Sequence, residues 1–248
     1  MLRAEILKLK RSATWIIAFI LPLLAVTTGT INLANNPDTL DAGWASFTSQ
    51  VTLFYGLLFF SIGIGLIAST AWRMEHRGTN WNLLLTTAGK PAKLAIAKVL
   101  VIMIPVAFMQ LVFVAGTLTS GSLVLGLDGE IPWQFAVVGA ISVLAALPLV
   151  AIQSLLSMLL KSFAAPVAIC LLGCVVGVAT VTSEVLRPLS FIWPQAINTR
   201  ALNLGSTALA NTGGLTVLDA LALIGAALGL TLVIVTATIS AIRTVKLR

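Results

Sequence analysis

The sequence has few charged residues, and this scarcity excludes most classes of soluble protein. Only 9% of its 248 residues are Asp, Glu, Lys or Arg, whereas 58% are hydrophobic. An ordinary soluble domain has about 25% charged residues, because its surface has to be hydrated. A disordered chain is also excluded, since disorder requires low hydrophobicity. Most of the chain is therefore expected to lie in lipid.

Residues that carry catalytic or metal chemistry are scarce as well. His76 is the only histidine, so one chain cannot build a His-based metal site or a catalytic triad. Cys170 and Cys174 cannot form a disulfide framework, and in an apolar run they are expected to act as small apolar groups. Gly89-Lys90 lacks the glycine five residues earlier that a P-loop requires. We therefore predict no catalytic, cofactor or metal site in this chain.

Six apolar segments are each long enough to cross a membrane as a helix. A span requires about 20 largely apolar residues, because each residue adds about 1.5 Å across a hydrocarbon core of about 30 Å. The segments are residues 12–33, 51–71, 94–118, 132–160, 162–181 and 218–242. The first is longer than the apolar core of a typical signal peptide, so we expect it to be retained. The sequence predicts an all-α integral membrane protein, with residues 1–248 forming a single transmembrane domain.

The basic residues are distributed unevenly among the segments that connect these spans. Thirteen of the fifteen lie before span one, between spans two and three, between spans four and five, or after span six. Only Arg187 and Arg200 lie on the other side. Because Lys and Arg are enriched on the cytoplasmic side, both termini are predicted to be cytoplasmic. The net charge of +7 therefore indicates orientation first, and we predict no nucleic-acid partner.

Two further segments are expected to be helical without crossing the membrane. Leu2, Ile6 and Leu9 recur at helical spacing, which suits an N-terminal interfacial helix or a plain positive anchor for span one. Residues 182–217 are too apolar for a free loop and too interrupted by prolines for a span. Outer interfacial or re-entrant helices are expected there.

The connection between spans two and three, residues 72–93, contains another amphipathic pattern. Thr79 is a suitable N-cap, Trp81, Leu84 and Leu85 form an apolar face, and Gly89 can end the helix. Such a helix either lies against lipid headgroups or docks a cytoplasmic partner. Composition alone does not favour docking, because aromatic and basic residues are enriched at membrane interfaces anyway.

Span five carries a stripe of small residues on one helix face, formed by Cys170, Gly173, Cys174 and Gly177. Small residues allow helices in lipid to approach closely. Packing within one subunit is the favoured interpretation, since such pairs are common in membrane helices. A dimer face made of these four residues is the alternative hypothesis.

The chain resembles the permease subunits of ABC-2 type exporters, in particular the six-span lantibiotic-immunity and bacitracin-resistance permeases. The first resembling motif is Glu5-x-x-Lys8 followed by Lys10-Arg11-Ser12, with Pro22 in span one. The second is Glu75-x-x-Gly78-Thr79-x-Trp81-x-x-Leu84-Leu85 followed by Gly89-Lys90-Pro91 and Lys98. The long apolar segment before span six is the third. One departure is that the basic residue expected directly after Pro91 stands two positions later, at Lys93.

The resemblance implies a coupling helix between spans two and three that docks into a cytoplasmic ATPase. It assigns this role to the segment from Glu75 to Leu85, namely Glu75, Gly78, Thr79, Trp81, Leu84 and Leu85. It also implies two ABC ATPase subunits that bind ATP and Mg²⁺, a second permease copy or a sister permease, and contact with membrane lipid. The chain itself would be no enzyme and would hold no cofactor.

The function expected from this resemblance is export of an amphipathic peptide, antibiotic or lipid-like molecule across a bacterial plasma membrane. An ion-coupled secondary transporter is one alternative, although no charged residue has to lie at the middle of a span as such carriers usually require. A non-transporting scaffold or immunity protein is the other alternative.

Overall fold

The computed structural model describes residues 2–10, 12–36, 40, 43–76, 89–206 and 216–244, and within these ranges it contains helices and no strands. The α-helices are α1 (Leu2–Leu9), α2 (Thr14–Asn35), α3 (Trp44–Phe54), α4 (Phe60–Arg73), α6 (Pro91–Thr119), α7 (Trp133–Ala145), α8 (Leu147–Leu159), α9 (Ala164–Thr182), α10 (Pro194–Leu202) and α11 (Val217–Thr244). Two π-helical turns, η1 (Tyr55–Phe59) and η2 (Ser120–Val124), extend α3 and α6, and a 3-10 helix, η3 (Arg187–Phe191), precedes α10.

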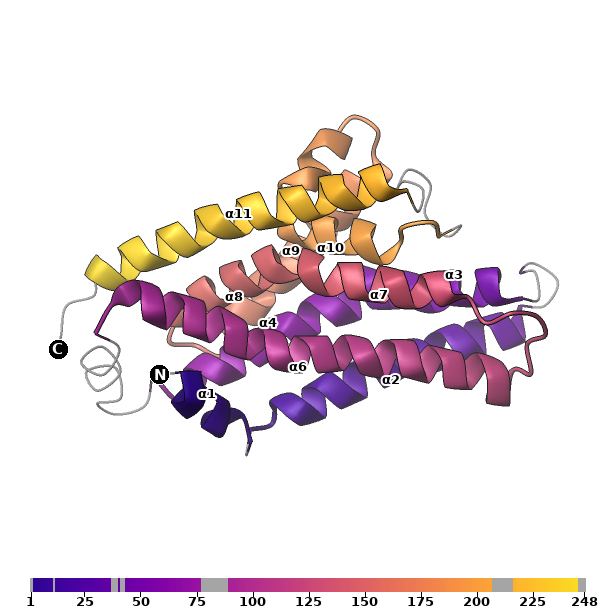
Figure 1. Ribbon diagram of the computed structural model, residues 1–248, viewed down its shortest axis with the longest axis horizontal. Helices are drawn as coiled ribbons and strands as arrows, with labels where there is room; N and C mark the ends of the chain where they lie inside the picture. The colour runs from indigo at the N-terminus through magenta and orange to yellow at the C-terminus, as the bar shows by residue number, and fades with distance from the viewer. Residues whose placement is uncertain are drawn as a thin grey trace.

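The helices form an elongated bundle in which α1 and the last turn of α11 lie at the same end (Figure 1). We call this the terminal end, and the opposite end, where α3 and α7 begin, the far end. Within the described ranges, six stretches are long and apolar enough to cross a membrane: Thr14–Asn35, Trp44–Arg73, Pro91–Val124, Trp133–Leu159, Ala164–Thr182 and Val217–Thr244. Each coincides with one predicted span, so the prediction of an all-helical protein with six candidate spans is confirmed.

The second span begins at Trp44, well before the predicted start at residue 51. Its first two turns are rich in Ser, Thr and Gln, so apolar periodicity alone missed them. Tertiary contacts stabilise these turns: the Trp44 ring packs so closely on Gly121 that a β-carbon there would lie 2.5 Å from it. The Asn32 amide also donates a hydrogen bond to the Gln50 side-chain oxygen at 2.9 Å.

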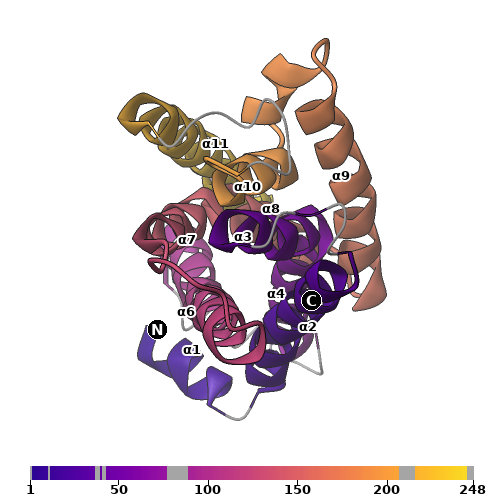
Figure 2. The same cartoon turned by 90° about the vertical axis from the view of Figure 1, so that its right-hand side faces the viewer.

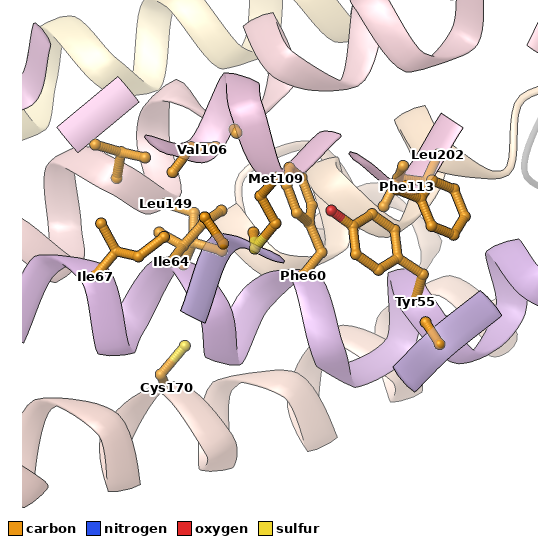
Figure 3. Packing of buried hydrophobic residues seen from close by; sticks show 14 of the residues in the cluster. Tyr55, Phe60, Ile64, Ile67, Val106, Met109, Phe113, Leu149, Cys170 and Leu202 are labelled. Atoms are coloured by element: carbon orange, nitrogen blue, oxygen red, sulfur yellow. The ribbon is translucent and has the colours of Figure 1, made fainter. Parts of the chain in front are cut away.

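The hydrophobic core is arranged around α4 and the π-helical turn before it. α4 contacts α2, α6, α8 and α9, and α9 and α11 lie at the periphery of the bundle (Figure 2). The ring of Tyr55 stacks on Phe113 with centroids 3.9 Å apart, and Ile64, Ile67 and Met109 are fully buried beside it (Figure 3). The core therefore joins α4 to four other helices.

The segment between α9 and α11 is helical, as expected from its apolar composition. It contains η3 and α10, and every residue of α10 from Gln195 to Leu202 is buried. α10 packs among α7, α8, α9 and α11. A short helix enclosed by long helices in this way resembles a re-entrant element more than a surface loop.

The N-terminal helix is present, but its inward face differs from the predicted apolar face. Glu5 and Leu9 are its buried residues, whereas Leu2 and Leu7 are exposed. Of the Leu2–Ile6–Leu9 pattern, only Leu9 is buried, and Ile6 is half-buried. The main inward contact of α1 is made by a carboxylate.

Candidate functional site

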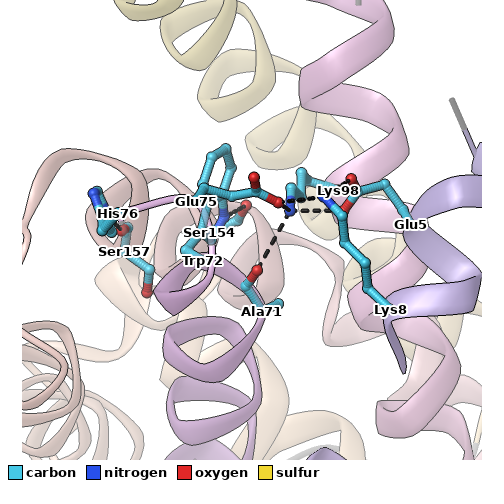
Figure 4. A network of polar contacts seen from close by, with 9 residues as sticks. All are labelled: Glu5, Lys8, Ala71, Trp72, Glu75, His76, Lys98, Ser154 and Ser157. Carbon is cyan, nitrogen blue, oxygen red and sulfur yellow. Dashed lines mark hydrogen bonds and ion pairs between the residues drawn. The ribbon is translucent and has the colours of Figure 1, made fainter. Parts of the chain in front are cut away.

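Four charged side chains from three separate parts of the sequence meet at the terminal end (Figure 4). Glu5 and Lys8 project from α1, Glu75 lies in the turn that follows α4, and Lys98 lies two turns inside α6. Residues 5 and 8 are one helical turn apart, so both reach the same side of α1. We call these four side chains the charge network.

Four ion pairs connect the side chains of the charge network. The Lys98 ammonium lies 2.6 Å from a Glu5 oxygen and 2.7 Å from a Glu75 oxygen. The Lys8 ammonium lies 2.6 Å from Glu5 and 2.6 Å from Glu75. Each carboxylate thus receives two cations, and the formal charges of the four side chains cancel. This balance is what allows charges to be enclosed in a protein at all.

Three members of the charge network are almost completely buried. The exposed fraction is 1% for Lys98, 3% for Glu75 and 4% for Glu5. The Lys98 ammonium also donates to the Ala71 carbonyl oxygen at 3.3 Å and lies 4.8 Å from the centre of the Trp72 ring. Trp72 in turn donates its indole N–H to the Ser154 hydroxyl on α8 at 2.8 Å. The network is therefore continuous with the packing of α4, α6 and α8.

The pKa values on α1 reflect this pairing. Burial raises the pKa of the Glu5 carboxyl, but attraction to Lys98 and hydrogen bonds from both lysines lower it by more, so it lies below its ordinary value. Burial lowers the pKa of Lys8, but its hydrogen bonds to Glu5 and Glu75 raise it by more, so it lies above its ordinary value. Both groups are therefore charged at neutral pH.

The charge network holds the two ends of the segment that was predicted to couple to an ATPase. Glu75 lies two residues before residues 77–88, and Lys98 lies ten residues after them in α6. A second contact lies beside Glu75: the His76 ring donates its Nε2–H to the Ser157 carbonyl oxygen of α8 at 2.8 Å. The helices that lead into and out of this segment are thereby fixed to each other, to α1 and to α8.

Of the predicted coupling residues, only Glu75 lies within the part of the chain that the structure describes. Glu75 belongs to the charge network, whereas Gly78, Thr79, Trp81, Leu84 and Leu85 lie outside the described residues. Sequence reasoning did not name Glu5, Lys8 and Lys98 as site residues. The available signal was a lysine placed inside a predicted span, at position 98 of the segment 94–118, because a charge at such a position needs a partner.

The small-residue face of α9 packs within the subunit. Cys170 is fully buried and donates its thiol to the Ser61 carbonyl oxygen of α4 at 3.2 Å. A β-carbon at Gly173 or Gly177 would meet Gln195 of α10, at 2.1 Å and 3.0 Å respectively. Cys174 is also buried. A dimer contact through this face would thus require α10 and α4 to move away from it.

No group of three or more His, Cys, Asp and Glu side chains that could hold a metal ion occurs within the described ranges. The charge network has two carboxylates, but both are already neutralised by lysines. Its ion pairs join α1, α6 and the turn after α4 to one another.

Comparison with known proteins identifies a family. A family model described as ABC-2 family transporter protein matches residues 1–177, which include the first four candidate spans, most of the fifth and the whole charge network. No curated protein and no solved structure matches the chain.

Proposed function

We propose that this chain, which belongs to the ABC-2 family of transporter proteins and is thus a membrane-spanning permease subunit of an ABC transporter, is an exporter. It exports an amphipathic molecule, and separate subunits hydrolyse the ATP that drives the export. The proposed assembly contains two cytoplasmic ATPase subunits and a second permease, either a copy of this chain or a sister chain. ATP and Mg²⁺ would be bound by the ATPase subunits. The resemblance to lantibiotic-immunity and bacitracin-resistance permeases supports a peptide antibiotic or a lipid-like molecule as the cargo, and a bacterial plasma membrane as the location.

The charge network is the observation that carries this proposal. An ATPase that closes on ATP can move the membrane helices only if its docking segment is firmly attached to them. Both flanks of residues 77–88 are joined by ion pairs of 2.6–2.7 Å to α1 and to each other. Removing one partner of a buried ion pair costs about 3–5 kcal/mol, so α1, α4 and α6 should move as one body when the segment is pushed.

The absence of a P-loop in the sequence is consistent with this division of labour. The permease would form the transport path and move its helices, and the partner ATPase would supply the energy by hydrolysing ATP. α4 would carry the movement into the core, since it contacts α2, α6, α8 and α9.

Co-purification with the ATPase tests the proposal. The wild-type chain, extracted gently from its native membrane, should bring an ATPase subunit with it. Trp81→Asp and Leu84→Asp should abolish that association, because a carboxylate would replace the apolar docking face. Trp133→Asp is a matched control, since Trp133 is an exposed tryptophan at the far end and its loss should leave the association intact.

Two results would contradict the proposal and support its alternatives. Transport by the purified chain in proteoliposomes that contain an ion gradient but no ATP would indicate a secondary carrier. Protection of cells that persists after the ATPase is inactivated would indicate a scaffold or immunity protein that only sequesters its target.

A further inference from the structure

A pocket at the far end of the bundle lies outside the machinery described so far. It has a volume of about 260 Å³, opens to the surface and is lined by α3, by the first turns of α7 and by the end of α10 with the chain that follows it. It is remote from the charge network, which lies at the terminal end (Figure 1). A cavity of this size holds much more than one water molecule, which needs only about 10–15 Å³.

The lining of the far-end pocket is mainly apolar, with a few polar but uncharged groups. α3 contributes the hydroxyl-bearing side chains of Thr48, Ser49 and Thr52, and α7 contributes the amide of Gln134. The remaining lining is mainly apolar and includes Phe135 and Leu202. No Asp, Glu, Lys, Arg or His is among its described lining residues.

The walls of the pocket are held in place by specific packing. Thr199 on α10 donates its hydroxyl to the Gly56 carbonyl oxygen at 3.0 Å, and a β-carbon on Gly56 would lie 3.4 Å from Leu202. α10 is thereby fixed against the π-helical turn below Thr52. Gly205 has a φ of +72°, a conformation that glycine adopts readily, and it turns the chain after α10 along the pocket wall. A preformed pocket with a few placed polar groups is typical of small-molecule sites.

We infer that the far-end pocket binds the uncharged, hydroxyl-bearing head of an amphipathic molecule such as a neutral glycerolipid. Burying a charged head would require a counter-charge, and the lining offers none. Hydroxyl and amide groups can instead donate to and accept from a neutral head, while Leu202 and Phe135 contact the adjoining apolar part. For its role as a cargo site the inference rests on the proposed export function, whereas the binding itself is a property of the pocket.

Photolabelling of the full-length chain in phosphatidylcholine nanodiscs tests this inference. The probe is a diacylglycerol with a photoactivatable group next to its free hydroxyl, and the comparison probe is a phosphatidic acid with the same acyl chains. The two differ by one phosphate. Diacylglycerol should label peptides that contain residues 45–52 and 132–138 about tenfold more strongly, because an unpaired charge is excluded from such a lining.

Three variants test whether the photolabel is bound in the far-end pocket. Ala45→Trp should fill the pocket from its exposed rim and abolish labelling, while Ala136→Trp, an exposed α7 position outside the lining, should leave it unchanged. Thr52→Val keeps the size of the side chain and removes one hydroxyl, so labelling should fall about fivefold, as expected for one hydrogen bond. This variant preserves the test if Ala45→Trp does not fold.

Equal labelling by both probes, or labelling unchanged in both Ala45→Trp and Thr52→Val, would overturn the inference. The outcome is separable from the proposed function. Absence of pocket labelling in a chain that still brings down its ATPase would remove the neutral-head site alone. Specific labelling in a chain that binds no ATPase would retain the site and remove the proposed export function.

Discussion

Lys98 is the residue on which the charge network depends most. Its ammonium is shared by two carboxylates that are themselves almost fully buried, and it is the least exposed of the four charged groups. Without it, Lys8 alone would have to neutralise Glu5 and Glu75. One uncompensated negative charge would then remain inside the bundle.

Lys98→Met should therefore destabilise the protein by about 3–5 kcal/mol, which is the cost of leaving a buried charge unpaired. A thermal unfolding scan of the protein in detergent should show a clearly lower transition temperature. Lys93→Met, which removes an exposed lysine from the first turns of the same helix, should change little.

A second substitution distinguishes loss of charge balance from loss of packing. Adding Glu5→Gln to Lys98→Met removes one negative charge from the network and should restore a large part of the lost stability. If the double variant is as unstable as the sum of both single variants, the network is not held by charge balance.

The attachment of α1 should depend on pH on the acid side. The folded pKa of Glu5 lies below its ordinary value of 4.5, so its stabilising contribution is complete above pH 4.5 and is lost as the pH falls through the lowered value. Lys8 has a pKa above its ordinary value of 10.5, so its contribution is complete below pH 10.5 and is lost only above the raised value. Hydrogen–deuterium exchange of residues 2–9, corrected for the intrinsic rate, should be constant at neutral pH and rise in acid. In Glu5→Gln this acid-induced rise should be smaller.

At the scale of single residues, the sequence indicated which residues are charged but not which of them meet. The pairing of Glu5 with Lys8 follows from local helical spacing. The contacts to Glu75 and Lys98 join positions far apart in the sequence and arise only when α1, α4 and α6 pack together. For the same reason, the stripe of small residues predicted a close helix contact but not its partner, α10.

Among the helices, α2 and α3 approach so closely at Gly29 that a larger side chain would meet backbone. A β-carbon on Gly29 would lie 2.8 Å from the Cα atom and 2.5 Å from a side-chain carbon of Val51. The backbone atom cannot be moved aside by a rotamer change. The packing of α3 at Val51 therefore relies on a glycine in the preceding helix.

Gly29→Ala should lower stability because α2 and α3 would be forced apart, and a core overpacked by one methyl group typically loses about 1–3 kcal/mol. Gly229→Ala is the matched change on α11, where a β-carbon meets nothing within 4 Å. It should raise stability by about 0.5–1 kcal/mol through helix propensity. Thermal unfolding of both variants decides between these directions, and a loss in Gly229→Ala would show that this part of α11 is in contact with a partner.

Element boundaries were predictable where apolar composition alone defines them. The fourth and fifth spans lie at Trp133–Leu159 and Ala164–Thr182, close to the predicted 132–160 and 162–181. The third span continues to Val124 through a π-helical turn at Ser120–Val124. The Ser and Gly residues of this turn are not typical of a membrane span, so composition did not predict it. The Ser120 hydroxyl pairs with that of Thr30 on α2 at 2.7 Å, which is a tertiary contact.

For the whole molecule, the remaining question is which end faces the cytoplasm. Arg73 ends α4 and Lys93 lies in the first turn of α6, both at the terminal end, and Lys161 lines a small pocket with Arg73 and His76. Asp128 and Glu130 lie in the chain that joins α6 to α7 at the far end (Figure 1). By the positive-inside rule the terminal end should be cytoplasmic. This orientation would present the flanks of residues 77–88 to an ATPase and the far-end pocket to the outer leaflet.

Cysteine accessibility in intact cells tests this orientation. Glu130→Cys and Lys161→Cys place thiols at exposed positions near opposite ends, and the two native cysteines are buried and can be replaced by serine as background. A membrane-impermeant maleimide should label Glu130→Cys in intact cells and Lys161→Cys only after the membrane is opened. The reverse pattern would place the charge network on the outer side. A cytoplasmic ATPase could not then reach the segment that the network holds, so the export proposal and the coupling role of Glu75 would both be lost.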